Sequence, residues 1–279
     1  EAGEVVDLRR PGTVHLVGVG GSGISAIAVI LATLGHRVSG SDVVATGAWP
    51  RLEAAGVRLE VVEESELFAA ADRSGAELVA HSTAFPPPAE QVAAIEARGG
   101  RVLDRAAILA AVCALRPTVA VSGTHGKTST TAMLATLLHE VGAGPSFLVG
   151  ATPASLGEAA RWAPTPGLFV VEADESDGSF VALGAPTAVV TNVDEDHLDH
   201  WGSIDAIEAA FDRFLAQATI RVVCIDVPGG SGDADPRALR LAARHGAVTV
   251  GEAPEAAWRI HSVRVERLTT RFGLTHDGV

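Results

Sequence analysis

The sequence predicts an α/β fold in which parallel sheets are covered by helices on both faces. Short apolar runs alternate with helical patterns along the chain, which is typical of parallel strands joined by helices. Two glycine-rich turns each follow an apolar run and open a helical pattern. No apolar run approaches the ~18 uninterrupted residues of a membrane-spanning helix. We therefore expect a soluble α/β protein.

The first half of the chain shows a regular alternation of strand and helix patterns. We expect strands at residues 14–17, 37–42, 57–62, 78–81 and 102–103, and helices at residues 24–34, 50–55 and 89–98. Gly35 is placed to end the first helix, because glycine readily adopts the left-handed conformation that follows many helices. These elements predict a Rossmann-like parallel sheet.

The alternation restarts after Leu115-Arg116-Pro117. We expect strands at residues 119–121, 168–171, 188–191 and 222–225, and helices at residues 128–141 and 204–215. Domains usually have ~100–200 residues, so the chain is long enough for two. We predict one domain at residues 1–116 and a second, of P-loop ATPase type, at residues 117–279.

The acidic composition limits the possible partners. The formal net charge is −13, so the surface should repel nucleic acid, and an anionic ligand must be held by local dipoles and a few cations. Residues 1–10 are charged and lack the apolar stretch of a secretion signal, so we expect a cytoplasmic protein without membrane association. Cys113 and Cys224 lie in apolar surroundings, which favours buried free thiols over a disulfide or a metal pair. The oligomeric state is left open.

The chain has a single lysine, and its position is the strongest functional signal. Of the 21 basic residues the other 20 are arginine, whereas Lys127 lies in the glycine-rich turn Gly123-Thr124-His125-Gly126-Lys127-Thr128. An ammonium is a compact point charge on a flexible stem, which a planar guanidinium does not replace. The turn therefore predicts a polyphosphate site. The alternative is a glycine turn with a solvated lysine.

This turn is a shortened form of a P-loop. The common form places the first glycine six residues before the lysine, whereas here Val121 occupies that place and Gly123 lies four residues before Lys127. Successive N–H groups at a helix start, together with the helix dipole, can still wrap a polyphosphate. Thr128 would then offer its hydroxyl to Mg²⁺.

Two acidic segments follow predicted strands, where open α/β sheets place their chemistry. Glu172 begins the segment 172–177, and Asn192 and His197 belong to the segment 192–200. If the three strands are neighbours, Thr128, Glu172 and His197 converge on one edge of the sheet. Because Mg²⁺ prefers oxygen ligands, Thr128 and Glu172 are the firmer predicted ligands and His197 the weaker one. The alternative is that both segments are ordinary solvated loops.

The first glycine-rich turn predicts a nucleotide-diphosphate site. Its residues are Gly18, Gly20, Gly21, Ser22 and Gly23, and Asp42 ends the following strand. In such a turn the glycines let the backbone approach a pyrophosphate, and the acid reaches a ribose hydroxyl. A sugar nucleotide satisfies this geometry as well as a nicotinamide cofactor does. A tight turn without a ligand is the structural alternative.

In this order, the motifs resemble those of the Mur ligases. The similarity is carried by residues 15–25, 39–42, 123–128, 172–177 and 196–199, and it spans nearly the whole chain. Within the family, the chain is most similar to the ligases that join L-alanine to UDP-N-acetylmuramate. It therefore implies a first domain for the UDP-sugar, a central domain for ATP and Mg²⁺, and a role in peptidoglycan synthesis.

The resemblance also implies a reaction and a set of roles. The lactyl carboxylate of UDP-N-acetylmuramate attacks the γ-phosphate of ATP, and the amine of L-alanine then displaces phosphate from the acyl phosphate. Lys127 would neutralise the β- and γ-phosphates, and His125 would touch the substrate or the acyl phosphate. Thr128 and Glu172 would hold Mg²⁺, and His197 a second ion. The implied ATP site comprises Gly123, Thr124, His125, Gly126, Lys127, Thr128 and Asn192.

Other readings remain open at this point. Sister ligases that use a carbamylated lysine fit less well, because there is no second lysine. A ligase that recycles a ready-made tripeptide, a divergent nucleotide-binding homologue without ligase activity and a nicotinamide-dependent oxidoreductase are the alternatives. The family's third domain is not represented in these 279 residues, so we expect them to bind ligands better than they turn them over.

Overall fold

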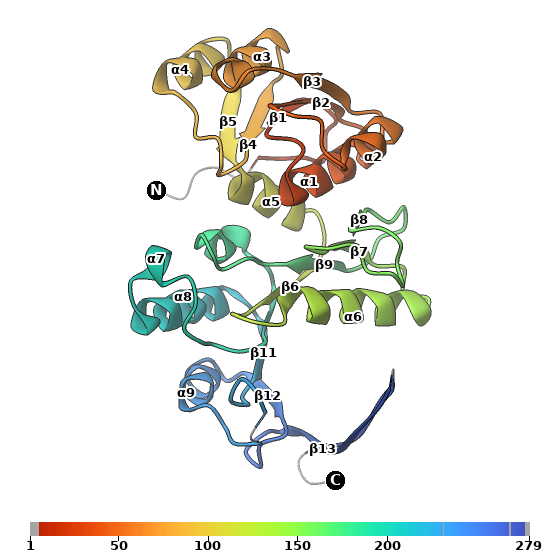
Figure 1. The fold of residues 1–279 in the computed structure, drawn as a ribbon, viewed down its shortest axis with the longest axis vertical. Coiled ribbons are helices and arrows are strands. Elements are labelled where there is room, and N and C mark those ends of the chain that lie inside the picture. Colours follow the sequence, from red (N-terminus) through yellow and green to blue (C-terminus); the bar gives the residue numbers. More distant parts are fainter. Residues whose placement is uncertain (1–5, 231, 268, 277–279) are drawn as a thin grey trace. The chain divides into compact units, whose positions relative to one another are not determined.

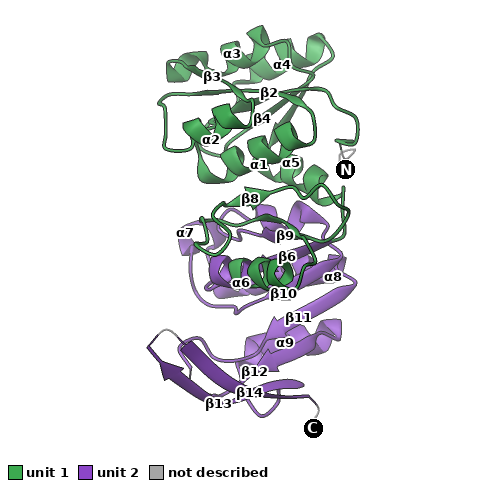
Figure 2. Ribbon diagram, turned by 90° about the vertical axis from the view of Figure 1, so that its right-hand side faces the viewer, with its two compact units in different colours: residues 1–117, 132–170 green, residues 118–131, 171–279 purple. Residues whose placement is uncertain are grey.

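The computed structural model describes residues 6–230, 232–267 and 269–276. Two compact units are present, one formed by residues 1–117 and 132–170 and the other by residues 118–131 and 171–279 (Figures 1 and 2). Part of the charged N-terminal stretch, residues 1–5, and the last residues, 277–279, lie outside the described residues. Among the described residues, no helix is long and apolar enough to cross a membrane.

The first unit contains a parallel five-stranded sheet. Its order is β3-β2-β1-β4-β5, so the strand order reverses between β1 and β4. The strands are β1 (Thr13–Val17), β2 (Arg37–Asp42), β3 (Arg58–Val61), β4 (Leu78–His81) and β5 (Arg101–Asp104). Ligands of open α/β sheets bind where the order reverses. The turn that follows β1 lies at this point.

Helices connect these strands, as the alternating pattern predicts. They are α1 (Ser22–Thr33), α2 (Trp49–Ala54), α3 (Leu67–Arg73), α4 (Ala89–Ala97) and α5 (Arg105–Cys113), with a 3₁₀ turn, η1, at Glu64–Glu66. Asp104 caps α5 by accepting a hydrogen bond from the N–H of Ala107 at 2.7 Å. Leu16 and Val17 are fully buried, which explains why the central strand is a continuous apolar run. The same unit includes the antiparallel strands β7 (Ser146–Leu148) and β8 (Ala160–Arg161).

The second sheet has the strand order β14-β13-β12-β11-β10-β6-β9-β7-β8. Its further strands are β6 (Thr118–Ser122), β9 (Phe169–Glu172), β10 (Thr187–Val190), β11 (Ile220–Cys224), β12 (Val248–Gly251), β13 (Trp258–Glu266) and β14 (Thr269–His276). The helical elements are α6 (Lys127–Glu140), η2 (Ser179–Leu183), α7 (Leu198–Trp201), α8 (Ile204–Gln217) and α9 (Pro236–His245). The boundary between the two compact units passes within α6 and β9.

Every strand and helix predicted from the sequence is present, with ends that agree to within two residues. The three strands that carry the candidate site residues are neighbours, because β6 lies between β10 and β9. Cys113 is buried, as predicted, whereas Cys224 is partly exposed.

His15 is a buried polar residue in the central strand of the first sheet. Its side chain lies between two serine hydroxyls, with Nδ1 2.9 Å from Ser39 Oγ and Nε2 3.0 Å from Ser41 Oγ. Burial, followed by the positive charge of Arg73, lowers the pKa of His15 to about 4. The imidazole is therefore neutral at pH 7, so one of its nitrogens accepts a hydrogen bond from a serine.

We expect the protein to lose stability as the pH falls from 6.5 towards 4. In this window the unfolded chain protonates His15 near its ordinary pKa of 6.5, while the folded chain keeps it neutral down to about 4. The unfolded state thus binds more protons than the folded state. A contribution of about 3 kcal/mol to the free energy of unfolding, fully present above pH 6.5, is therefore lost as the pH falls to 4. Urea unfolding at pH 7.5 and 4.5 measures this change in the free energy of unfolding. His15→Gln, which keeps both hydrogen-bonding functions, should show a smaller pH difference, and an unchanged difference would contradict this assignment.

Candidate active site

The lysine turn connects β6 directly to α6 and depends on its first glycine. Gly123 has a φ of 138°, which disfavours residues with a side chain. A Cβ at this position would also lie 2.9 Å from the main-chain N of Thr191 and 3.0 Å from that of Asn192. Both contacts are with backbone atoms, so a side chain here would fit only if the main chain moved. The shortened loop is therefore held against the segment that follows β10.

That segment holds the loop through hydrogen bonds between side chains and main-chain groups. Asn192 accepts from the N–H of His125 with Oδ1 at 2.9 Å and donates from Nδ2 to the carbonyl of His125 at 2.8 Å. Thr191 Oγ1 donates to the same carbonyl at 2.6 Å. The hydroxyl of Thr124 accepts from the N–H of Asp194 at 2.9 Å. Asn192, whose task the sequence left open, thus positions the loop.

Lys127 begins α6 and turns its ammonium back onto the loop. Nζ donates to the carbonyl oxygens of Gly123 at 2.9 Å and Thr124 at 3.2 Å, and to Glu175 Oε1 at 2.9 Å. The side chain is only 13% exposed. The alternative of a lysine in bulk water therefore does not fit this geometry.

Glu175 is a site residue that the sequence reasoning missed. Its side chain is 3% exposed, and Oε2 lies 2.7 Å from the ammonium of Lys127. Burial is the largest influence on this carboxyl and raises its pKa, while the hydrogen bond from Lys127 acts in the opposite direction. Trp201 Nε1 donates to the main-chain oxygen of Glu175 at 3.2 Å and fixes the segment. The available signal was its place in the acidic run directly after β9, where only Glu172 was singled out.

Thr128 and Glu172 meet beside the loop, as predicted. Thr128 Oγ1 donates to Glu172 Oε1 at 2.8 Å. Adjacent ligands of an octahedral Mg²⁺ lie about 3 Å apart when each is 2.0–2.1 Å from the metal. The two oxygens are therefore spaced as two adjacent ligands of one such ion would be. Among the described residues no group of three or more His, Cys, Asp or Glu side chains is arranged to hold a metal ion.

His197 lies beside Glu175 and Asp196. Its Nε2 is 3.9 Å from Glu175 Oε1 and 3.9 Å from Asp196 Oδ2. The backbone of His197 has a φ of 51°, an unusual value for a residue with a side chain, and its N–H donates to Asp196 Oδ1 at 2.8 Å. His125 is more exposed, with Nε2 3.7 Å from Asp194 Oδ2. Roles for both histidines remain predictions.

In the first unit, Asp42 supports the glycine turn after β1. Its Oδ2 accepts from the N–H of Gly20 at 2.7 Å, and Oδ1 accepts from the N–H of Val43 at 2.8 Å. A Cβ on Gly20 would lie 2.9 Å from Oδ2 of Asp42, so glycine is needed for this close approach. Gly18 has a φ of 74°, and the N–H of Gly21 donates to its carbonyl at 3.1 Å. Ser22 and Gly23 form the first turn of α1.

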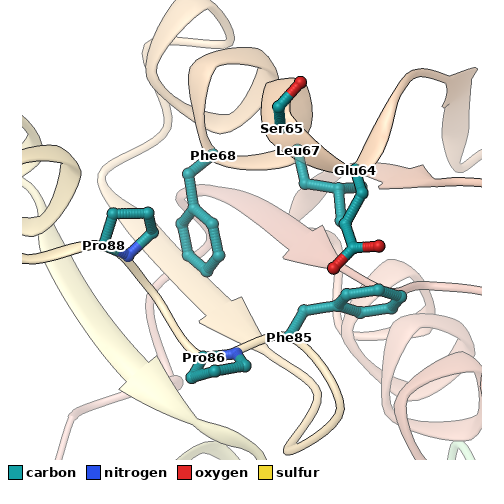
Figure 3. Close-up of a pocket in the computed structure, with 7 residues that line it drawn as sticks. All are labelled: Glu64, Ser65, Leu67, Phe68, Phe85, Pro86 and Pro88. Atoms are coloured by element: carbon teal, nitrogen blue, oxygen red, sulfur yellow. The ribbon is translucent and has the colours of Figure 1, made fainter.

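A cavity of about 480 Å³ lies beside this turn (Figure 3). Phe68, Phe85, Pro86 and Pro88 form its apolar walls, and the carboxylate of Glu64 points towards the ring of Phe85. Phe85 connects the cavity to the glycine turn, because its Cδ2 would be 2.8 Å from a Cβ on Gly18. The cavity was not predicted, since its lining comes from segments after β3 and β4 that carry no motif.

Family models match both halves of the chain. The model described as "Mur ligase family, catalytic domain" matches residues 13–116, and the model described as "Mur ligase middle domain" matches residues 121–276. The chain belongs to the Mur ligase family. The resemblance inferred from the motifs is thus confirmed.

Two Mur ligases named UDP-N-acetylmuramate–L-alanine ligase are among the similar curated proteins. The protein from Acidothermus cellulolyticus is 44% identical over 99% of this chain and 56% of its own length. The protein from Clavibacter michiganensis is 42% identical over 96% of this chain and 54% of its own length. The chain therefore spans about half the length of the curated relatives it matches.

Solved Mur ligase structures share the fold. A UDP-N-acetylmuramate:L-alanyl-γ-D-glutamyl-meso-diaminopimelate ligase from Neisseria meningitides matches with a TM-score of 0.80 and 25% identity over 96% of this chain and 85% of that one. A UDP-N-acetylmuramate-alanine ligase from Thermotoga maritima matches with a TM-score of 0.77 and 23% identity over 96% and 58% of the two chains. The predicted α/β fold class, Rossmann-like and then P-loop-like, is confirmed.

Proposed function

We propose that this chain provides the sugar-nucleotide and ATP sites of a ligase that joins L-alanine to the lactyl carboxylate of UDP-N-acetylmuramate in peptidoglycan synthesis. The observation that carries the proposal is the convergence of the only lysine and the Thr128–Glu172 pair at the loop between β6 and α6. The relatives of that name, 44% and 42% identical over nearly the whole chain, support the choice of substrates.

The ATP site is proposed at residues 123–128 with Asn192. The side chain of Asn192, which bonds the N–H and the carbonyl of His125, would keep the loop in a shape in which its other N–H groups can reach phosphate oxygens. Lys127 supplies the positive charge for the β- and γ-phosphates, and this charge stabilises the phosphoryl group in transfer to the carboxylate. Mg²⁺, held by Thr128 and Glu172, would neutralise the same phosphates. His197 is proposed as a ligand of a second ion, and His125 as a contact of the substrate.

The UDP-sugar site is proposed at the turn after β1. Gly18, Gly20, Gly21, Ser22 and Gly23 would approach the pyrophosphate with their backbone, and Asp42 holds this turn in shape. The neighbouring cavity has room and aromatic walls for the base of the nucleotide. This division of labour corresponds to the domains proposed at residues 1–116 and 117–279.

The location and partners follow from the same proposal. A ligase that uses ATP and UDP-N-acetylmuramate works in the cytoplasm, where both are available. The net charge of −13 disfavours nucleic acid as a partner, and no membrane association is proposed.

Calorimetric titration of the chain with UDP-N-acetylmuramate, MgATP and NAD tests this function. We expect saturable binding of the first two and none of NAD. Binding of NAD without the other two would contradict the ligase function. Phosphate release by the protein that contains this chain should require both L-alanine and UDP-N-acetylmuramate. Release that depends instead on a tripeptide would favour a recycling ligase.

A further inference from the structure

The three N–H donors of Lys127 are all engaged within the protein. They point to the carbonyl oxygens of Gly123 and Thr124 and to the carboxylate of Glu175, at 2.9, 3.2 and 2.9 Å. A lysine has three such donors. A phosphate oxygen can therefore bind this ammonium only by replacing one of the three acceptors.

Of the three acceptors, the carboxylate of Glu175 is the one most similar to a phosphate. The two carbonyls belong to residues three and four positions before Lys127, so they stay with the lysine as parts of one loop. Glu175 comes from the separate segment after β9, and its two oxygens lie 2.9 and 2.7 Å from Nζ. Like a phosphate, it offers more than one anionic oxygen to the same cation.

We propose that Glu175 competes with the terminal phosphates of ATP for the ammonium of Lys127 and thereby lowers the affinity of the site for nucleotide. This inference rests on the proposed function of the loop as an ATP site. Without nucleotide the carboxylate holds the ammonium. When the triphosphate enters, Lys127 exchanges the carboxylate for phosphate oxygens.

The burial of Glu175 makes this exchange costly. The side chain is 3% exposed, and a buried carboxylate that loses its cation is strongly disfavoured. Trp201 keeps the main chain of Glu175 in place, so the carboxylate stays near the loop, where its charge repels the incoming phosphates. His197 Nε2 lies 3.9 Å from Glu175 Oε1, too far for a hydrogen bond that would replace the lost ammonium. Loss of the cation and repulsion both oppose nucleotide binding, and both disappear with the charge of Glu175.

Glu175→Gln in the full chain tests the proposal by calorimetry with MgATP. We expect the Kd for MgATP to fall about tenfold, because the neutral amide releases the ammonium more easily. The Kd for AMP, which lacks the phosphates that Lys127 binds, should not change. A folded variant that binds MgATP equally or more weakly overturns the proposal. If the unaltered chain does not bind MgATP at all, the proposed function itself fails.

Two further variants separate competition from general repulsion. Glu195→Gln removes an exposed charge from the loop after β10, and its Kd should change less than about twofold. In a Lys127→Met background, Glu175→Gln should tighten binding much less, because only the repulsion between the carboxylate and the phosphates is then removed. An equal gain in that background overturns the proposal.

A variant that keeps the charge tests the proposal in the case that Glu175→Gln does not fold. Glu175→Asp retains the carboxylate but shortens it by one methylene, which lengthens the contact with Nζ. We expect a fall in Kd smaller than that of Glu175→Gln, with an unchanged circular dichroism spectrum. If Glu175→Gln does not fold, tighter binding by Glu175→Asp supports the competition and equal or weaker binding overturns it.

Discussion

Lys127→Arg is expected to reduce phosphate release by on the order of 10²–10³-fold, the range found when a single donor to a developing anion is lost. The physical reason is that three acceptors converge on one nitrogen atom, Nζ, within 2.9–3.2 Å. A guanidinium spreads its donors over three nitrogens in a plane and cannot point them at one spot. The positive charge is kept, so the loss reports the shape of the cation. Phosphate release with saturating substrates measures it.

An arginine-to-lysine exchange on the protein surface is the matched control for Lys127→Arg. Arg213, exposed on α8, can be changed to lysine without touching the loop. Arg213→Lys should leave the rate within about twofold, since exposed charges contribute little. A normal rate for Lys127→Arg would show that the site does not need a point charge, and the role assigned to the lysine would be wrong.

Glu172→Gln is expected to raise the Mg²⁺ concentration needed for half-maximal phosphate release by at least about tenfold and to lower the maximal rate by about 10²-fold. The amide can still accept the hydroxyl of Thr128, which lies 2.8 Å from Glu172 Oε1, so the local packing is retained. What is lost is the anionic oxygen that a hard cation prefers. A titration of activity with Mg²⁺ at fixed ATP separates the two effects.

Asp199→Asn provides the control for charge alone. Asp199 is exposed in the first turn of α7, so the variant removes one negative charge from the same unit without removing an oxygen near Thr128. Its Mg²⁺ dependence should match that of the unaltered protein. An unchanged Mg²⁺ dependence of Glu172→Gln would place the metal elsewhere.

The sequence predicted the fold well where strands are buried on both faces. The central strands β1, β6, β9 and β10 are apolar runs, and runs of this kind are distinct from the helical patterns between them. The positions of Lys127, Thr128 and Glu172 followed because each stands beside the end of such a strand. Their convergence depended on strand order, which a pattern along the chain suggests but does not determine.

Other elements were missed for identifiable reasons. After Arg105 the helix α5 consists only of alanine and other apolar residues, so it lacks the periodicity that marks an amphipathic helix. The hairpin of β13 and β14 is mostly exposed, so it lacks a continuous apolar run. The helix α9 was also missed, although Asp235 and Pro236 form a clear helix start.

Only part of the candidate site was predicted from the sequence. Charge and motif position can be seen in a sequence, whereas burial cannot. Glu175 stands among three other acidic residues in the segment 172–177, and nothing in that run indicates that its side chain reaches Lys127. The cavity near Phe85 likewise depends on two segments, one after β3 and one after β4, that meet only in the folded chain. Asn192 was singled out, but its clamp on His125 required the geometry of the loop.

A crystal structure of the protein with Mg²⁺ and a non-hydrolysable ATP analogue tests the central claim most directly. The account predicts that Nζ of Lys127 lies within about 3 Å of β- and γ-phosphate oxygens, having left Glu175. It also predicts one Mg²⁺ about 2.1 Å from Thr128 Oγ1 and from a carboxylate oxygen of Glu172. A triphosphate bound away from the loop at residues 123–128, with the ammonium still paired to Glu175, would contradict it.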